Sequence, residues 1–181
     1  MTIRSFESVD RSTFRWLRRE GAPTAFDLLS GDDLVASLTW ARTHGTLANG
    51  GTASDHFTLK REGFLAPHVL ARDPRGGVIA RLDLHLRSSL LTVGTTSFVL
   101  RRKGLLILAW QLATLTGAPL LHIETVAEHG ALKGGVVAVE PAARDMGSLP
   151  LMLLVSWYYL VQAWFEEEAA SVSTAAVVAS G

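Results

Sequence analysis

One pattern occurs three times along this chain and constrains its fold more than any single residue does. Each copy starts at a phenylalanine, carries a pair of basic residues and ends at a glycine; the copies are Phe14–Gly21, Phe57–Gly63 and Phe98–Gly104. Their closing glycines lie 42 and 41 residues apart. A fixed period of this length indicates a repeat architecture, so the chain is expected to build one supersecondary unit three times.

Turn-forming residues recur at matching places inside each copy. Second turns are expected at 30–33, 73–77 and 116–119, third turns near 44–45, 88–89 and 129–130, and closing turns near 49–51, 94 and 133–135. Between turns the chain alternates as a half-buried strand does, with Leu82 and Leu84 on one face and Arg81 and Asp83 on the other. Four strands per copy, joined by short turns in which glycine tolerates positive φ, predict about twelve antiparallel strands between residues 13 and 140.

The C-terminal part of the chain breaks this rhythm. Residues 146–165 carry no charge, and Ser148 before a Leu-Pro pair is a favourable helix start. A helix that is apolar on every side must be buried, and we predict such a helix over 149–165. Three glutamates follow at 166–168, and the Ala/Ser/Val segment 169–181 is expected to form a flexible tail.

The predicted number of strands and the predicted apolar helix support each other. A barrel of about eight strands is filled by its own side chains, and one of about sixteen keeps an open channel. About twelve strands leave a space that a helix about 10 Å across can fill. The predicted fold is therefore all-β with one central helix: a closed barrel of about twelve antiparallel strands, in three four-strand repeats, threaded by a hydrophobic C-terminal helix. Residues 1–12 form an N-terminal extension to this barrel domain, which covers 13–168.

A membrane anchor is the alternative role for the apolar segment. Residues 146–165 are long enough to cross a bilayer as a transmembrane helix. The glutamates at one end argue against it, as does the absence of a Lys/Arg cluster at either end. A membrane span would also leave the barrel empty.

Composition narrows the classes of function. The 181 residues include 17 basic and 17 acidic ones, so there is no excess of positive charge for binding nucleic acid. The absence of cysteine excludes disulfides, thiolate metal sites and cysteine nucleophiles. The first residues lack a signal-peptide pattern, so a cytoplasmic location is expected. Arginine outnumbers lysine 14 to 3, which points to a GC-rich, bacterial genome.

The strand number, the Phe-x-Leu-basic-basic-x-Gly repeat and the apolar terminal helix together resemble the tubby-like superfamily. This superfamily comprises the tubby C-terminal domain, the plant LURP-one-related proteins and the phospholipid scramblases. The resemblance covers residues 13 to about 168 and implies a twelve-stranded closed barrel threaded by its C-terminal helix. It also implies a non-enzymatic binding or scaffolding domain, with anionic membrane phospholipid as the ligand and a peripheral place at the membrane.

The chain differs from the proteins of this superfamily in several features. It lacks the proline-rich N-terminal segment and the palmitoylated cysteines of scramblases, and the strongly basic phosphoinositide-binding surface of tubby. A β-propeller is a rival interpretation of a period near 42, because its blades also have four strands. Three blades fall below the usual number, and the Trp-Asp signature is absent.

The basic residues of the three copies are the candidate binding site for lipid or phosphate. They are Arg18, Arg19, Lys60, Arg61, Arg101, Arg102 and Lys103. Equivalent positions in a closed barrel lie at one rim, and alternation is expected to place Arg18, Lys60 and Arg101 on one face and their neighbours on the other. Such a ring suits phosphate groups, which form charge-assisted hydrogen bonds. The alternative is that charged strand ends only keep the hairpins soluble and block edge pairing.

Patterns for catalysis and for metal binding are weak. The histidines are His44, His56, His68, His85, His122 and His129. None has metal-ligand spacing, and the two that precede turn glycines are expected to serve the turns. No phosphate-binding glycine loop or nucleophile elbow occurs. We therefore expect no catalytic residue, metal or cofactor, and an enzyme with an unrecognised site is the remaining alternative. The aromatic residues between 157 and 165 are expected to form core.

Overall fold

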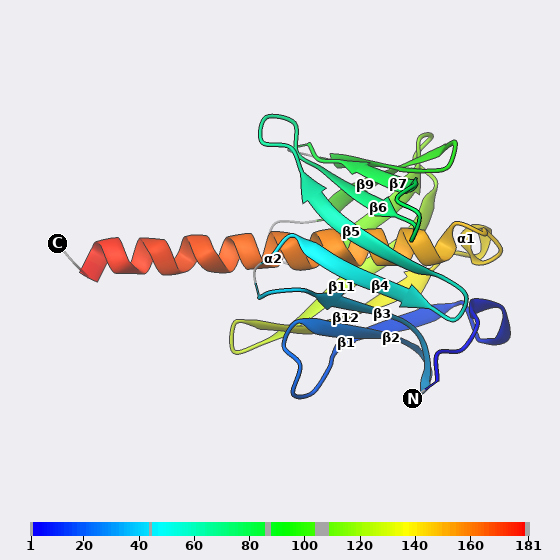
Figure 1. Ribbon diagram of the computed structural model, residues 1–181, viewed down its shortest axis with the longest axis horizontal. Helices are drawn as coiled ribbons and strands as arrows, with labels where there is room; N and C mark the ends of the chain where they lie inside the picture. The colour runs from blue at the N-terminus through cyan, green and yellow to red at the C-terminus, as the bar shows by residue number, and fades with distance from the viewer. Residues whose placement is uncertain (1, 44, 86–87, 104–108, 180–181) are drawn as a thin grey trace.

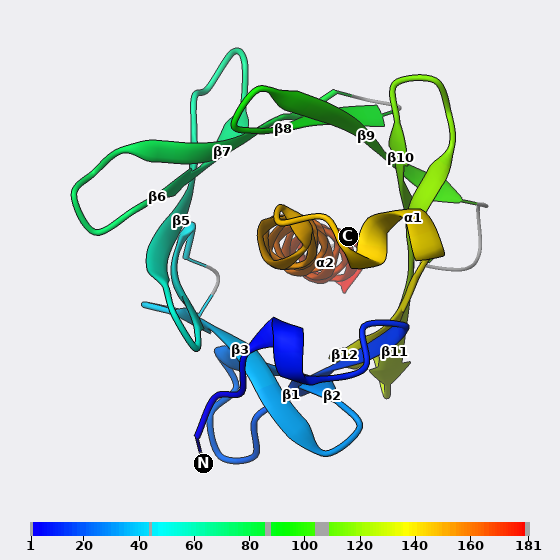
Figure 2. The same cartoon turned by 90° about the vertical axis from the view of Figure 1, so that its right-hand side faces the viewer.

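The structure, a computed structural model, describes residues 2–43, 45–85, 88–103 and 109–179, with side chains described as far as Glu168. The described residues form a closed barrel of twelve antiparallel strands around a central helix, α2 (Leu149–Ala179) (Figures 1 and 2). Each strand pairs with its neighbours in sequence, and β1 pairs with β12 to close the barrel. The strands are β1 (Thr13–Arg18), β2 (Ala25–Ser30), β3 (Asp33–Trp40), β4 (Leu47–Thr52), β5 (His56–Glu62), β6 (His68–Arg72), β7 (Val78–Asp83), β8 (Ser88–Val93), β9 (Thr96–Lys103), β10 (Ala109–Thr114), β11 (Pro119–Glu128) and β12 (Ala131–Val139).

The three predicted copies correspond to β1–β4, β5–β8 and β9–β12. Their first strands begin as predicted, one or two residues before Phe14, Phe57 and Phe98. Gly21 and Gly63 occupy the turns that follow β1 and β5, with φ of 70° and 82°, a region that favours glycine. The equivalent Gly104 lies outside the described residues.

Some predicted turns are wrong. Residues 88–89 begin β8 rather than forming a turn. Gly50 and Gly134, expected in closing turns, lie inside β4 and β12. They are needed there for space: a Cβ on Gly50 would lie 2.5 Å from the ring of Phe57, and one on Gly134 would lie 2.0 Å from the carbonyl oxygen of Trp16.

Strand alternation produces the core. Along β5, Phe57 and Leu59 are buried between exposed neighbours, and Phe98 and Leu100 repeat this pattern in β9. These inward side chains pack against α2, so the prediction that they face the helix is confirmed. The barrel has one contiguous hydrophobic core, to which each of the three copies contributes.

Helix α2 fills the barrel, as predicted. It starts directly after Ser148, and its aromatic residues are core: the ring of Trp157 stacks on that of Trp16 at 5.4 Å, and Tyr158 stacks on Trp40 at 5.5 Å. The predicted end at Phe165 is too early, because the helix continues to Ala179 and projects beyond the barrel (Figure 1). A flexible tail at 169–181 stays a prediction.

The alternative of a membrane span at 146–165 is not supported. Within the part of the chain that the structure describes, no helix is both long enough and apolar enough to cross a bilayer. Most apolar side chains of this segment are buried inside the barrel, and those of Leu153, Leu154 and Val161 are at most 1% exposed. The burial that the sequence demands is therefore provided by protein.

The two ends of the barrel are built differently, and we name them by what lies there. At the capped end, the short helices η1 (Phe6–Ser8) and α1 (Pro141–Arg144) lie over the barrel opening (Figure 2). Phe6 in η1 is 8% exposed, and its ring lies 5.6 Å from that of Phe14. At the opposite, exit end, α2 leaves the barrel (Figure 1).

Candidate functional site: the exit end of the barrel

The predicted basic residues are found at the exit end, because odd-numbered strands run toward it. The cores of β1, β5 and β9 align on Phe14, Phe57 and Phe98, and the fourth residue after each phenylalanine is an arginine. These three residues are Arg18, Arg61 and Arg102. They lie in register with the inward residues Phe26, Val69 and Trp110 of the next strands. We call this set the inner arginines.

The predicted division of the basic pairs is therefore wrong by one residue in the first copy. Arg18 shares the inward face with Arg61, whereas Lys60 and Arg101 face outward. The glycine lies seven positions after the phenylalanine in the first copy and six positions after it in the other two, so aligning the copies on their glycines shifts the first strand by one residue. A shift of one residue moves a side chain to the other face of a strand.

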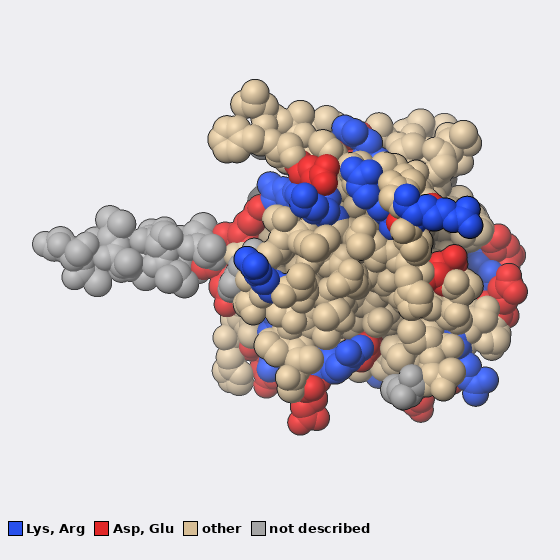
Figure 3. Space-filling view, in the orientation of Figure 1, with Lys and Arg blue, Asp and Glu red and all other residues tan. Residues whose placement is uncertain are grey.

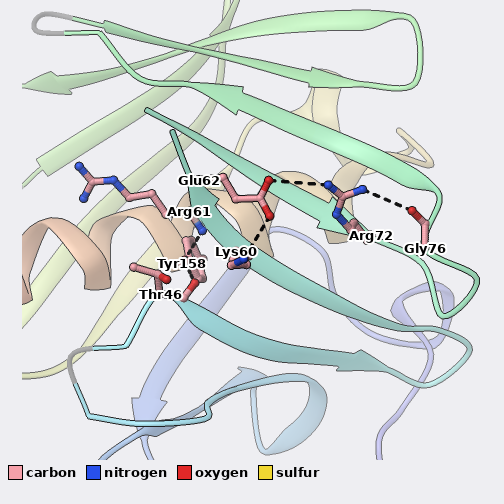
Figure 4. A network of polar contacts seen from close by, with 7 residues as sticks. All are labelled: Thr46, Lys60, Arg61, Glu62, Arg72, Gly76 and Tyr158. Atoms are coloured by element: carbon pink, nitrogen blue, oxygen red, sulfur yellow. Dashed lines mark hydrogen bonds and ion pairs between the residues drawn. The ribbon is translucent and has the colours of Figure 1, made fainter. Parts of the chain in front are cut away.

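Arg61 is held between the barrel and α2. Its backbone N–H donates to the hydroxyl of Tyr158 at 3.0 Å, and that hydroxyl donates to the carbonyl of Thr46. Burial raises the pKa of Tyr158 above its ordinary value, so the hydroxyl stays protonated and can make both contacts. The guanidinium pairs with Glu166 of α2, and Figure 4 shows this side chain directed away from Lys60 and Glu62.

Arg102 forms the second contact between the rim and the helix. Its Nη1 lies 3.5 Å from Oε1 of Glu167. Trp110, opposite Arg102 on β10, meets the ring of Tyr159 edge-on at 5.5 Å. The glutamates after the apolar helix thus provide partners for inner arginines. The sequence signal was available, because a carboxylate run begins where a barrel-filling helix must leave the barrel.

Arg18, the third inner arginine, has a different environment. Its guanidinium carbon lies 5.4 Å from the centroid of the Phe26 ring, a cation–π contact. Among the described residues, its buried Nε has no hydrogen-bond partner and the side chain forms no ion pair. Arg18 is therefore a partly buried cation without a compensating carboxylate.

Several outward cations at this end are neutralised by near neighbours. Nε of Arg19 donates to Asp27 at 3.0 Å, and Nζ of Lys60 lies 3.4 Å from Glu62. Arg72 approaches the other oxygen of Glu62 at 3.8 Å (Figure 4). On the face seen in Figure 3, basic side chains over the β5–β6 region accordingly have acidic ones between them. These pairs fit the alternative that strand-end charges serve solubility.

Other cations at the exit end have no carboxylate partner among the residues that the structure describes. Arg101 donates from Nε and Nη2 to the amide oxygen of Gln111, at 3.2 and 3.0 Å. Lys103, at the end of β9, and Arg42, between β3 and β4, are exposed. Within the described parts of the chain, none of these three side chains forms an ion pair. Like Arg18, they lie at the end of the barrel from which α2 leaves.

A cleft of about 660 Å³ opens beside α2 at this end. It is lined by Arg61, Pro67, Leu84, His85, Tyr159, Ala163 and Glu166. Its arginine and its glutamate already pair with each other, so the Arg61 guanidinium is not free to bind an anion there.

The described histidines make separate local contacts. His122 Nε2 lies 3.1 Å from Glu140, and His68 Nδ1 lies 3.0 Å from the carbonyl of Ala66. His129 occupies its turn with φ of 51°, as its position before a glycine predicted, whereas His44 lies outside the described residues. Across the described ranges, no group of three or more His, Asp or Glu side chains could hold a metal ion.

Comparison with known proteins gives no further guide. No family model, curated protein or solved structure matches this chain. The resemblance to the tubby-like superfamily therefore stays a prediction, and a function must be argued from the exit end itself.

Proposed function

We propose that this protein is a non-enzymatic binding domain whose exit end docks on an anionic phospholipid surface. The observation that carries this proposal is a set of cations at the exit end that have no carboxylate partner among the described residues: Arg18, Arg42, Arg101 and Lys103. Lipid phosphates are the complementary groups, because they accept charge-assisted hydrogen bonds from guanidinium and ammonium donors.

The arrangement of these residues favours a surface over a small ligand. They come from β1, the β3–β4 connection and β9, and β3 and β9 lie on opposite sides of the barrel. A small anion cannot reach all of them, but a flat, charged surface pressed against the exit end can. The resemblance to tubby-like proteins points to the same ligand. We therefore place the protein at the cytoplasmic face of a membrane, as a peripheral component.

The expected affinity is modest. A basic residue near an anionic surface contributes about 1 kcal/mol, and screening acts over a Debye length of about 10 Å at 0.1 M salt. Arg18 is partly buried and contributes less than the exposed residues. Binding should therefore depend steeply on salt and disappear well below about 1 M.

The test is sedimentation of the full-length protein with vesicles of phosphatidylcholine, with and without phosphatidylserine. The protein should sediment only with the acidic vesicles. Replacement of Arg42, Arg101 and Lys103 together by glutamine should weaken this binding by about a hundredfold, the equivalent of about 3 kcal/mol.

The matched control removes three cations at the capped end, Arg4, Arg15 and Arg75, and should bind like the wild type. If the variant lacking Arg42, Arg101 and Lys103 binds as well as the wild type, these cations are not the binding site. If the wild type does not bind acidic vesicles at low salt, the whole proposal is wrong.

A further inference from the structure

The connection between β5 and β6 presents two adjacent large apolar side chains to solvent. Phe64 is 97% exposed and Leu65 is 93% exposed. The next most exposed large apolar side chain among the described residues is Leu115, at 66%. Single exposed apolar residues are ordinary, but two neighbours that are almost wholly exposed at one tip require an explanation.

The base of this loop is held by defined contacts. Gly63 has φ of 82°, and a Cβ there would lie 2.5 Å from the carbonyl oxygen of Ala66. That carbonyl lies 3.0 Å from Nδ1 of His68, and the carbonyl of Pro67 accepts the N–H of Leu84 at 3.1 Å. The tip is therefore presented by a turn of fixed geometry.

The position of the loop selects a lipid surface as its partner. It lies at the exit end and stands out from the barrel in both ribbon views (Figures 1 and 2). Lys60 and Arg61 in the preceding strand are paired with Glu62 and Glu166, but Arg42 and Lys103, which have no carboxylate partner among the described residues, lie at the same end of the barrel as the tip. α2 projects from the same end, and the sequence after Glu168 has no charged residue. Apolar side chains beside basic ones suit the boundary between acyl chains and anionic headgroups.

We propose that Phe64 and Leu65 insert into the acyl region of an anionic bilayer and fix the orientation of the barrel on it. This inference rests on the proposed function and adds the inserted element. Burial of either side chain in lipid should strengthen binding about tenfold or more. The apolar contribution should also persist at salt concentrations that screen the cations.

The absence of cysteine allows a direct test. Leu65→Cys is labelled with a polarity-sensitive fluorophore and mixed with vesicles of phosphatidylcholine and phosphatidylserine. The matched control is Leu115→Cys, which places the label on an exposed turn at the capped end. We expect a blue shift and protection from an aqueous quencher for the label at 65, and no change for the label at 115.

The outcomes separate the two proposals. If labelled protein sediments with the vesicles but the label at 65 stays in water, insertion is wrong and lipid docking stands. If the protein does not sediment, both fail.

Replacement of Phe64 and Leu65 by serine gives the second measurement. The double variant should lose at least about tenfold in vesicle binding with an unchanged melting temperature, whereas Leu115→Ser should bind normally. Unchanged vesicle binding by the double variant overturns the inference. If vesicle binding is unchanged but a wild-type dimer dissociates in the variant, the tip is a contact between copies of this chain.

Discussion

At the capped end of the barrel, polar contacts join the N-terminal extension and α1 to the strands, whereas at the exit end several described cations have no carboxylate partner. Arg11 at the capped end donates to the carbonyl of Arg144 at 2.7 Å and lies 3.4 Å from Asp145. Ser30 donates to the carbonyl of Asp10 at 2.6 Å, joining the N-terminal extension to β2. The exit end instead carries Arg42, Lys103 and the exposed β5–β6 tip.

This difference makes the two ends of the barrel distinct. The three repeats place equivalent positions at the same rim, and the N-terminal extension and α1 cover one of the two rims. Contacts at the covered rim stabilise the fold, and the described residues of the other rim are the ones on which the proposed docking rests. Changes at the two ends should therefore affect different measurements.

The largest expected effect on stability comes from the part of α2 inside the barrel, between the two ends. Leu154→Asp places a carboxylate at a position that is 0% exposed, and burying an unpaired charge costs several kcal/mol. This variant should fail to fold cooperatively, as measured by circular dichroism and thermal unfolding. Leu115→Asp, the same change on an exposed turn, should unfold within about 0.5 kcal/mol of wild type. Cooperative unfolding of Leu154→Asp would show that α2 is not essential core.

A second, smaller effect is expected at the seam between β1 and β12. Gly134→Ala would put a Cβ 2.0 Å from the carbonyl oxygen of Trp16, so the two strands must separate. We expect a loss of about 2–4 kcal/mol in the free energy of unfolding, measured with urea. Gly147→Ala, where a Cβ would meet nothing within 4 Å, is the control and should be neutral or slightly stabilising. Similar stability of the two variants would mean that the seam yields easily.

The sequence allowed the barrel to be predicted because its signals are local and repeated. Inward residues such as Phe57 and Leu59 alternate within one strand, and the glycine turns recur at one period. The apolar helix was placed by elimination, since no other site could bury it. Gly50 and Gly134 were misplaced because a glycine needed for space inside a strand has the same sequence signature as one needed for a turn.

The site was less predictable because it depends on register and on contacts distant in sequence. The basic residues were found, but one extra residue in the first copy moved Arg18 to the inner face. The pairing of Arg61 with Glu166 joins residues from opposite parts of the chain and requires knowing where α2 leaves the barrel. The exposure of Phe64 and Leu65 is also a property of the folded loop.

Breaking one ion pair at each end should lower stability by less than the glycine substitution does. Glu166→Gln removes the partner of Arg61 at the exit end, and Asp145→Asn removes that of Arg11 at the capped end. Both pairs are partly exposed, so each change should cost about 0.2–1 kcal/mol in urea unfolding at low salt. A loss of about 3 kcal/mol or more for Glu166→Gln would mean that this pair behaves as a buried one and fastens α2 to the rim.

The smallest expected effect is on how stability changes as the pH falls, and it involves one carboxylate near each end. Hydrogen bonds from Ser12 lower the pKa of Asp10 at the capped end, and the hydrogen bond from Arg81 lowers the pKa of Asp83, at the exit-end terminus of β7. A carboxylate whose pKa is lower in the folded state stabilises that state above the unfolded pKa of about 3.9, and the contribution is lost as pH falls through the folded value. The melting temperature of Asp83→Asn should therefore be slightly below that of the wild type at neutral pH, and the difference should be smaller than for the ion-pair variants. It should disappear as the pH falls to about 3. Asp10→Asn should show the same direction. A difference from wild type that grows on acidification would show that these carboxylates do not stabilise the fold in their charged form.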